Sequence, residues 1–388
     1  MSETAAPDEH ATQSPRSMSQ PGDNPGAGID YGLFLDCVHC GLCTASCPTY
    51  AELGDENRGP RGRIYLMRAV TDERLNLTDE VRGHLDSCLD CRACETACPS
   101  GVQYGRLLEP IRVAMEEQAP QESSESDWFR DWILHGLFPY PEKLRVALAP
   151  ARIAQRLGLD RLAINLGLTK LLPGPMGRMA ELLPPLPPSG KRLPEFLPAE
   201  GKRRARVGLF TGCVADAMFR PTHWATARVL QKNGCDVVIP QSQACCGAIH
   251  YHSGSSEPAR ELSDANVKAF NLDDLDAVIV NVAGCGSMLK DYGHHWDDGQ
   301  QESREQFAGK VRDVAEFLDE LGLIPPTGEI NASAAYQDAC HLRHAQQVFE
   351  APRRILRQIP GLKLKEINEG DLCCGAAGTY NLTQPEMS

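Results

Sequence analysis

The sequence predicts an α+β protein of several domains: an N-terminal helical domain, a helical linker region and a C-terminal α/β domain made of two repeats. Three observations support this prediction. The chain has 388 residues, too many for one ordinary hydrophobic core. Two cysteine motifs with helical patterns between them lie near the N-terminus. From residue 206 onward, strand-like apolar runs alternate with helical patterns, and the arrangement occurs twice.

The expected boundaries follow from changes in composition. Residues 1–28 are rich in Ser, Pro, Gly and Ala and predict a disordered tail. The helical domain is expected over 29–116 and a linker with further helices over 117–205. The α/β domain is expected over 206–388, with repeats of about 206–325 and 326–388, the second of them incomplete.

Composition and charge narrow the class of protein. Hydrophobic residues make up 42% of the chain and charged residues 23%, as in soluble globular proteins. The net charge of −13 argues against nucleic acid as a partner. The N-terminus has neither the basic nor the apolar segment of a signal peptide, and no apolar run is long enough for a membrane span. Cysteines in such a chain favour metal or redox chemistry over disulfides.

Two cysteine motifs, C-V-H-C-G-L-C-T-A-S-C-P and C-L-D-C-R-A-C-E-T-A-C-P, begin at Cys37 and Cys88. Four cysteines at i, i+3, i+6 and i+10 followed by Pro are typical of [4Fe–4S] ligation, and in two-cluster proteins the fourth cysteine binds the other cluster. We therefore expect one cluster on Cys37, Cys40, Cys43 and Cys98, and a second on Cys88, Cys91, Cys94 and Cys47. Zinc is the alternative, but its usual paired Cys-x2-Cys spacing fits poorly, and a disulfide framework fits less well.

The segment between the two motifs is long enough for helices. I-Y-L-M-R-A-V and D-E-V-R-G-H-L-D-S-C predict two of them, so the domain is expected to be a helical, ferredoxin-like one that conducts electrons and does not catalyse. Arg58, Arg61 and Arg63 could lie near the clusters and tune their potentials, or could be solvated.

Residues 128–185 combine apolar residues with a net charge of +4, from eight Lys/Arg and four Asp/Glu. One interpretation is a face for a membrane surface or a quinone. The other, which the sequence alone favours, is a set of helices packed against the neighbouring domain.

The α/β domain contains an internal repeat. Apolar runs end at Cys213 and Cys340, and two Cys-Cys-Gly triplets follow at Cys245–Gly247 and Cys373–Gly375. Helices are expected over 222–234 and 352–359, between the strands, which predicts parallel strands with cysteines at their ends. Cys285 has no counterpart in the second copy, and we favour truncation of a longer chain over a repeat that is genuinely short.

The cysteines of this domain form a second candidate cofactor site. Adjacent cysteines suit a multinuclear cluster better than one small ion, and a vicinal disulfide is the alternative. Cys235 is expected to be a core thiol. His250, His252, His341 and His344 are expected to be packed or solvated. The candidate ligands of a further iron–sulfur cluster are Cys213, Cys245, Cys246, Cys285, Cys340, Cys373 and Cys374.

This pattern resembles the cysteine-rich "CCG" domain of heterodisulfide reductases and related redox proteins. Together with the helical two-cluster domain, the chain resembles the glycolate oxidase (glycolate dehydrogenase) iron–sulfur subunit, through segments such as G-D-E-N-R-G-P-R-G-R-I-Y-L-M and D-L-C-C-G-A-A-G-T-Y-N-L-T-Q-P-E-M-S. One departure is Met288, which stands where the last cysteine of the reductase pattern is expected. A five-cysteine noncubane cluster cannot be carried over intact, so a cluster with fewer thiolates, or none, stays open.

The resemblance implies an oxidoreductase subunit that relays electrons. Glycolate would be oxidised at FAD on partner dehydrogenase subunits, and this chain would pass electrons towards a quinone or membrane acceptor. No flavin-binding glycine motif occurs here, so FAD and substrate oxidation are expected on a partner chain, and the catalytic residues stay unknown. The expected location is cytoplasmic, with a peripheral position on the inner face of the membrane as an option. The alternatives are the same role for lactate or glycerol 3-phosphate, a disulfide reductase, and a zinc-stabilised assembly protein.

Overall fold

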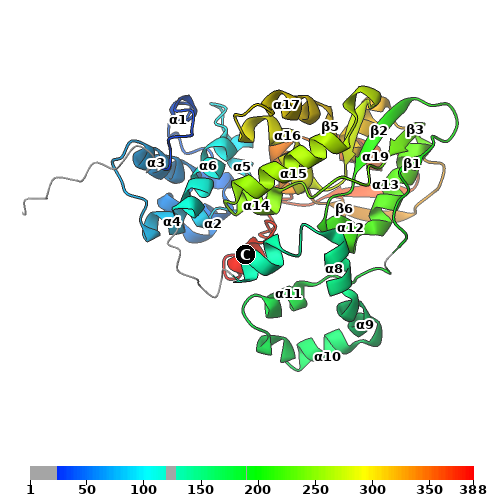
Figure 1. Ribbon diagram of the computed structural model, residues 1–388, viewed down its shortest axis with the longest axis horizontal. Coiled ribbons are helices and arrows are strands. Elements are labelled where there is room, and N and C mark those ends of the chain that lie inside the picture. Colours follow the sequence, from blue (N-terminus) through cyan, green and yellow to red (C-terminus); the bar gives the residue numbers. More distant parts are fainter. Residues whose placement is uncertain (1–23, 119–127, 189) are drawn as a thin grey trace, which may run out of the picture.

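The computed structural model of the chain describes residues 24–118, 128–188 and 190–388. A helical domain lies at one end, an α/β domain lies at the other, and the linker helices form a loop that projects away from both (Figure 1). The predicted combination of a helical domain, a helical linker and an α/β domain with two repeats is confirmed.

The N-terminal domain is entirely helical within its described residues. Its helices are α1 (Gly32–Leu35), η1 (Thr44–Ser46), α2 (Pro48–Leu53), η2 (Glu56–Arg58), α3 (Pro60–Thr71), α4 (Asp79–Asp86), α5 (Ala93–Thr96) and α6 (Tyr104–Glu117). The two helices expected between the cysteine motifs are α3 and α4.

Local sequence signals explain where these two helices begin. Pro60 occupies the first turn of α3, and the Thr78 side chain caps α4 by accepting a hydrogen bond from Val81 N. Apolar residues at helical spacing on α3, including Ile64 and Met67, are buried against α6, which supplies Leu107, Leu108 and Ile111. This core holds both cysteine motifs at its edge.

The predicted disordered tail falls mostly outside the described residues. The part that is described, residues 24–28, contacts α3, because Asn24 Nδ2 donates a hydrogen bond to Thr71 O over 2.8 Å. Ile29 is buried in the same core. The packed domain therefore begins a few residues before the expected boundary.

The sequence alone favours linker helices packed against the neighbouring domain, but only some of them pack in this way. They are η3 (Phe129–His135), α8 (Pro141–Ala147), α9 (Ala149–Leu157), α10 (Leu159–Asn165), η4 (Leu168–Leu171) and α11 (Met176–Leu182). Phe129, Leu134 and Leu144 are buried, and α8 packs on α12. In contrast, α9 and α10 contain no buried residue. Packing against the neighbouring domain therefore describes only the beginning of this region.

The first repeat and the edge strand β1, which precedes it in the segment expected as linker, form a five-stranded sheet in the order β1-β3-β2-β4-β5, parallel except for β1. Its strands are β1 (Phe196–Leu197), β2 (Ala205–Phe210), β3 (Cys235–Val238), β4 (Ala277–Val280) and β5 (Val311–Asp313). Helices connect and cover them: α12 (Val214–Met218), α13 (Arg220–Lys232), α14 (Ala248–His252), α15 (Ser256–Ala269), η5 (Leu272–Asp274), α16 (Ala283–His295), α17 (Gln301–Lys310) and α18 (Val314–Leu321).

The strand that follows β2 in sequence, β3, lies on one side of β2, and the next strand, β4, lies on its other side. The strand order therefore reverses at β2, which is the switch point of the sheet. Loops at the carboxyl ends of strands around such a point form the usual site of an open α/β sheet. The strands themselves are buried, as the continuous apolar runs predict: Val278, Ile279 and Val280 are fully inaccessible to solvent.

The second repeat forms a separate sheet of two parallel strands. It contains β6 (Ala332–Tyr336), η6 (His341–Ala345), α19 (Glu350–Arg357), β7 (Leu362–Glu366) and α20 (Tyr380–Thr383). The expected strand–helix–strand order is present in both repeats. Among the described residues, no helix is long and apolar enough to cross a membrane.

Candidate iron–sulfur centres

The two cysteine motifs of the N-terminal domain adopt the same backbone conformation. In the first, His39 and Gly41 have positive φ values of 55° and 83°; in the second, Asp90 and Arg92 occupy the equivalent positions with φ of 52° and 58°. Alternation of right- and left-handed residues turns successive backbone N–H groups into a concavity that suits an anion. Asp90 N already donates to Cys88 Sγ over 3.4 Å.

A first cavity is lined by cysteines of both motifs. Its thiols are those of Cys37, Cys40, Cys43, Cys94 and Cys98. Four of these are the predicted ligands of the first cluster, and the fourth cysteine of the first motif, Cys47, is not among them. The loop that carries this cavity is partly open, because Cys40 is exposed.

A second cavity lies deeper in the domain. Its thiols are those of Cys47, Cys88, Cys91 and Cys94, the four predicted ligands of the second cluster. Cys47, Cys88 and Cys91 are buried. Cys94 lines both cavities, so the two are direct neighbours.

Crowding of the thiols affects their ionisation. Burial and the neighbouring Cys37 thiol raise the pKa of Cys43 to about 11, and burial together with Cys88 raises the pKa of Cys94 well above its usual value. The raised pKa values favour the protonated thiols, and a bound metal cation would stabilise the thiolates instead. Groups of thiols without oxygen ligands, gathered around anion-accepting loops, fit iron–sulfur clusters.

The sequence leaves open whether Arg58, Arg61 and Arg63 lie near the clusters or in solvent, and the three have different environments. Arg63 is 1% exposed and donates to His84 O and to the hydroxyls of Thr49 and Ser87, next to the thiols of the second cavity. Arg61 lines the first cavity and donates to His39 O over 3.1 Å. The Arg58 side chain pairs with Asp55 at the surface, but its main-chain O accepts a hydrogen bond from Thr49 Oγ1 and lies 3.9 Å from Cys47 Sγ. Arg61 and Arg63 therefore bring their side chains to a cysteine site, and Arg58 brings its main chain.

The α/β domain gathers the first repeat's cysteines at the ends of its three central strands. Cys213 follows β2, Cys245 and Cys246 follow β3, and Cys285 follows β4. Cys213 Sγ lies 3.0 Å from Cys245 Sγ, and Cys246 Sγ lies 3.3 Å from Cys285 Sγ.

Neighbouring side chains define how this site is built. Hydrogen bonds from the Cys245 and Cys285 thiols hold the pKa of Cys246 well below its usual value. The main chain of the pair is fixed by Asn266, which donates to Cys245 O, and by Tyr292, which donates to Cys246 O. Met288 is buried in the same core, whereas Cys235 is a core thiol of a different cluster of apolar side chains.

The second repeat brings its cysteines to the N-terminal domain. Cys373 accepts hydrogen bonds from the thiols of Cys340 and Cys91, which hold its pKa at about 3. Cys91 also lines the second cavity. Cys374 is exposed. No sequence signal predicts the contact between Cys91 and Cys373, because the two residues lie in different domains, near opposite ends of the chain.

The four histidines make packing and hydrogen-bonding contacts. His250 stacks on His135 with ring centroids 4.5 Å apart, and His341 contacts Asp90 O across the domain boundary over 2.9 Å. His344 lies between Thr96 Oγ1 and Asp371 O. His252 joins a polar cluster described next.

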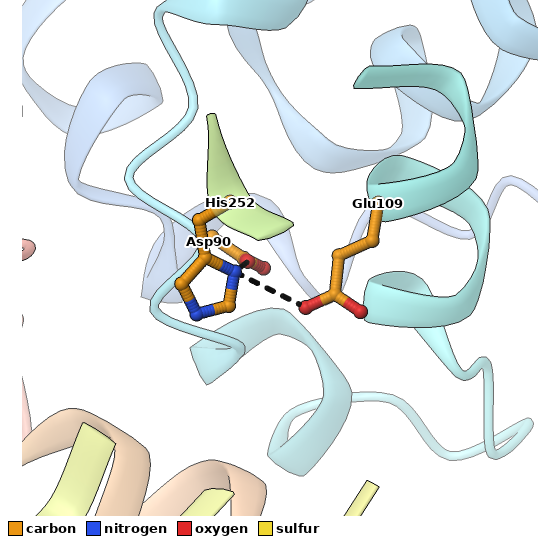
Figure 2. A group of neighbouring side chains, drawn as sticks. All are labelled: Asp90, Glu109 and His252. Carbon is orange, nitrogen blue, oxygen red and sulfur yellow. Dashed lines mark ion pairs between the residues drawn. The ribbon is translucent and has the colours of Figure 1, made fainter. Parts of the chain in front are cut away.

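A buried polar cluster between the two domains could not be predicted from the sequence. His252 Nδ1 lies 3.5 Å from both Asp90 Oδ2 and Glu109 Oε1 (Figure 2). The Arg92 guanidinium donates to Glu109 Oε1 over 3.0 Å and to Asp291 Oδ2 over 2.9 Å. The three side chains in Figure 2 are close enough to hold a metal ion, but Arg92 already supplies a cation, so we assign no metal.

Burial dominates the ionisation of this cluster. It raises the pKa of Glu109 to about 8 and lowers that of His252 to about 4. Burial also opposes ionisation of Asp90, but Arg92 and His252 outweigh it and hold the pKa of that carboxyl below its usual value. The cluster joins α6 of the helical domain to α14 and α16 of the α/β domain.

A helical domain with two thiol-lined cavities, joined to an α/β domain with cysteines at its strand ends, is the architecture of an iron–sulfur electron-transfer protein. Family models agree: residues 34–102 match the 4Fe-4S dicluster domain, 125–183 match "Glycolate oxidase iron-sulfur subunit, linker region", and 207–290 with 334–388 match the cysteine-rich domain.

Several curated relatives match over nearly the whole chain, and others match about half of it. The probable glycolate oxidase iron–sulfur subunit of Bacillus subtilis is 41% identical, covering 93% of this chain and 82% of the relative. The glycolate oxidase iron–sulfur subunit of Escherichia coli is 34% identical, covering 92% and 82%. Lactate utilization protein A of Geobacillus kaustophilus is 31% identical, covering 47% and 77%. No solved structure matches. The chain belongs to the family of glycolate oxidase iron–sulfur subunits.

Proposed function

We propose that this chain is the electron-transfer subunit of a flavin-dependent glycolate dehydrogenase. The observation that carries the proposal is a continuous series of thiols. It begins at the partly open first cavity, passes through Cys94 to the second cavity, and continues from Cys91 to Cys373 and Cys340 at the domain boundary.

The proposed ligands of the two [4Fe–4S] clusters are those predicted from the motifs. Cys37, Cys40, Cys43 and Cys98 hold the first, and Cys88, Cys91, Cys94 and Cys47 hold the second. When bound, each cluster accepts and passes on one electron at a time. The protein's part is to supply thiols and N–H groups at both sites and to keep the second site away from water through burial of Cys47, Cys88 and Cys91.

The first repeat offers a place for a further iron–sulfur cluster. Four thiols meet in two close pairs, and Gly247, with φ of 85°, makes the turn that places Cys245 and Cys246 side by side. In the second repeat, Cys340 and Cys373 are in contact, but the described chain brings no fourth thiol of that repeat to them.

Substrate oxidation is assigned to partner subunits that carry FAD, and the proposed final acceptor is a quinone of the membrane. The proposed location is the cytoplasm, at the inner face of that membrane. Support comes from relatives named as glycolate oxidase subunits, and a subunit implies a complex.

A second candidate is the same electron-transfer role for lactate. It is favoured by the similarity to lactate utilization protein A, which covers 47% of this chain. The thiol sites cannot distinguish the two donors, because the electron donor is bound elsewhere.

The test is anaerobic purification of the chain with the flavoprotein that co-elutes. We expect glycolate to reduce a dye at least tenfold faster than lactate does. A faster rate with lactate would support lactate as the electron donor instead. Iron analysis is expected to give about eight irons per chain for two cubanes and about twelve if the first repeat also holds a cluster. Zinc without iron, or thiol–disulfide turnover by the isolated chain, would contradict electron relay.

A further inference from the structure

The linker helices expose an unusual number of apolar side chains. Ten of them lie between Val146 and Leu172, and each is between 39% and 81% exposed. We call them the linker surface: Val146, Ile153, Leu157, Leu159, Leu162, Ile164, Leu166, Leu168, Leu171 and Leu172. Single exposed apolar residues are ordinary, but ten of them within one short segment mark a candidate binding surface.

The spacing of these residues gives each helix an apolar face. On α9, Ile153 and Leu157 are four residues apart; around α10, Leu159, Leu162 and Leu166 lie at positions 1, 4 and 8. Such residues share one side of a helix. Because neither helix has a buried residue, these apolar faces are not used by the described part of the chain.

The charge of the same segment is opposite to that of the whole chain. Residues 141–172 contain six Lys/Arg and two Asp/Glu, a net charge of +4 in a chain of −13. Arg156, Arg161 and Lys170 are exposed, and among the described residues none of them forms an ion pair with a carboxylate. Many other surface arginines do form one, such as Arg354 with Asp319.

The loop is held to the body of the protein at its base. Arg145 Nη1 lies 3.3 Å from Asp216 Oδ2, and Arg152 Nη2 donates to Ala217 O over 2.8 Å. Leu144 is buried beside this contact. The linker surface therefore projects from a fixed position, as Figure 1 shows for α9 and α10.

We infer that the linker surface docks this chain on a bilayer that contains anionic phospholipids. Short helices with leucine-rich faces and unpaired basic residues lie in the interface of such bilayers, with apolar side chains among the acyl chains and cations at the phosphates. The rest of the acidic chain is repelled by the same surface, which orients the protein with this loop towards the membrane. The inference rests on the membrane location proposed above and is independent of the electron donor.

The experiment is vesicle flotation of the full chain, purified anaerobically with its clusters. Vesicles that mix phosphatidylcholine with phosphatidylglycerol are compared with vesicles of phosphatidylcholine alone. We expect the partition coefficient to be at least tenfold higher on the anionic vesicles and to fall as salt is raised.

Two sets of variants assign the binding to the linker surface. Leu157→Ser, Leu162→Ser and Leu166→Ser together are expected to lower the partition coefficient at least tenfold. Arg156→Gln, Arg161→Gln and Lys170→Gln together are expected to abolish the preference for anionic lipid.

Matched controls alter exposed residues of the α/β domain, namely Val229→Ser, Ile324→Ser and Ile330→Ser, or Lys202→Gln, Lys363→Gln and Lys365→Gln. They are expected to bind like the wild type.

Three results would overturn the inference. They are absence of vesicle binding by the wild type, equal loss in the linker variants and the matched controls, and loss of flavoprotein co-elution in the leucine variant without any change in vesicle binding. The last would assign the surface to a protein partner. Reduction of a soluble dye by glycolate tests the proposed function separately, because it requires no membrane.

Discussion

At the scale of single residues, the fourth cysteine of each motif decides how the two cavities are completed. Cys47 lines only the second cavity, and Cys98 lines only the first. In the proposed ligand assignment each motif therefore depends on the other for its fourth thiol, which would explain why the motif occurs twice.

Cys47→Ser is expected to remove chiefly the second cluster, and Cys98→Ser chiefly the first, because each leaves one cavity with a missing thiolate. EPR spectra of the reduced proteins measure this, together with loss of up to about four irons per chain. Cys235→Ser, in the core of the α/β domain, is the control and should keep both signals. Loss of the first signal in Cys47→Ser would contradict the exchange.

Arg63 and Arg92 are buried cations that line the second cavity, and the charge of Arg63, the less exposed of the two, should contribute to the potential there. Arg63→Met is expected to make the reduction potential of the second cluster more negative by roughly 50–100 mV, since a unit charge at roughly 8 Å is worth roughly 2 kcal/mol at an effective dielectric of about 20. Redox titration followed by EPR measures the change.

Arg58→Met is the matched control for that substitution, because the Arg58 side chain pairs with Asp55 at the surface, and its contact with Cys47 is made by the main chain, which the substitution keeps. It should change the potential little. Equal shifts in the two variants would mean that Arg63 acts only through the fold.

At the scale of elements, the Cys-Cys-Gly turn is constrained by its glycine. A Cβ on Gly247 would lie 3.1 Å from Ala259 O, and the residue has φ of 85°. Gly247→Ala is expected to lower the free energy of unfolding by at least about 2 kcal/mol, from backbone strain and overpacking together. Urea unfolding monitored by circular dichroism measures it.

Gly201 separates the two causes, because it has φ of 80° but open space around its Cα. Gly201→Ala should cost only about 1 kcal/mol, from backbone strain alone. If the two variants lose the same stability, the contact with Ala259 is unimportant.

The elements that the sequence predicts are those with strong local signals. Apolar runs predict β2 and β6, the repeated strand–helix–strand order predicts β3 and β7, and helical patterns predict α3, α4, α13 and α19. β1 and β5 have only two and three residues, so periodicity cannot reveal them. The exposure of α9 and α10 escapes prediction for another reason: an apolar helical face looks the same in sequence whether it is buried or waits for a partner.

Motif spacing predicts which cysteines form each candidate centre. It does not predict which centres lie next to one another in the folded chain. Contact between Cys91 and Cys373 depends on how two domains meet, and no local rule specifies that contact. The same holds for Asp90, Glu109 and His252, which come from three distant segments.

At the scale of the whole molecule, Arg92 joins the domains because it is the cation among three carboxylates. It contacts Glu109 on its own domain and Asp291 on the other, with Asp90 3.9 Å away. Removing a partner from a buried charge costs far more than removing the pair. Substitution of Arg92 should therefore destabilise the protein much more than substitution of Glu109.

Arg92→Gln is expected to lower the free energy of unfolding by about 3–5 kcal/mol at pH 7, because it leaves the buried Asp90 carboxylate and the half-buried Asp291 without their cation. Glu109→Gln should cost much less, since Arg92 keeps Asp291 and the substitution removes a carboxyl whose pKa burial has raised to about 8. The double variant should recover part of the loss, so the two effects are not additive. Urea unfolding with iron analysis of each folded variant measures this. Equal losses in the two single variants, or strict additivity, would show that the domains are held together by other contacts.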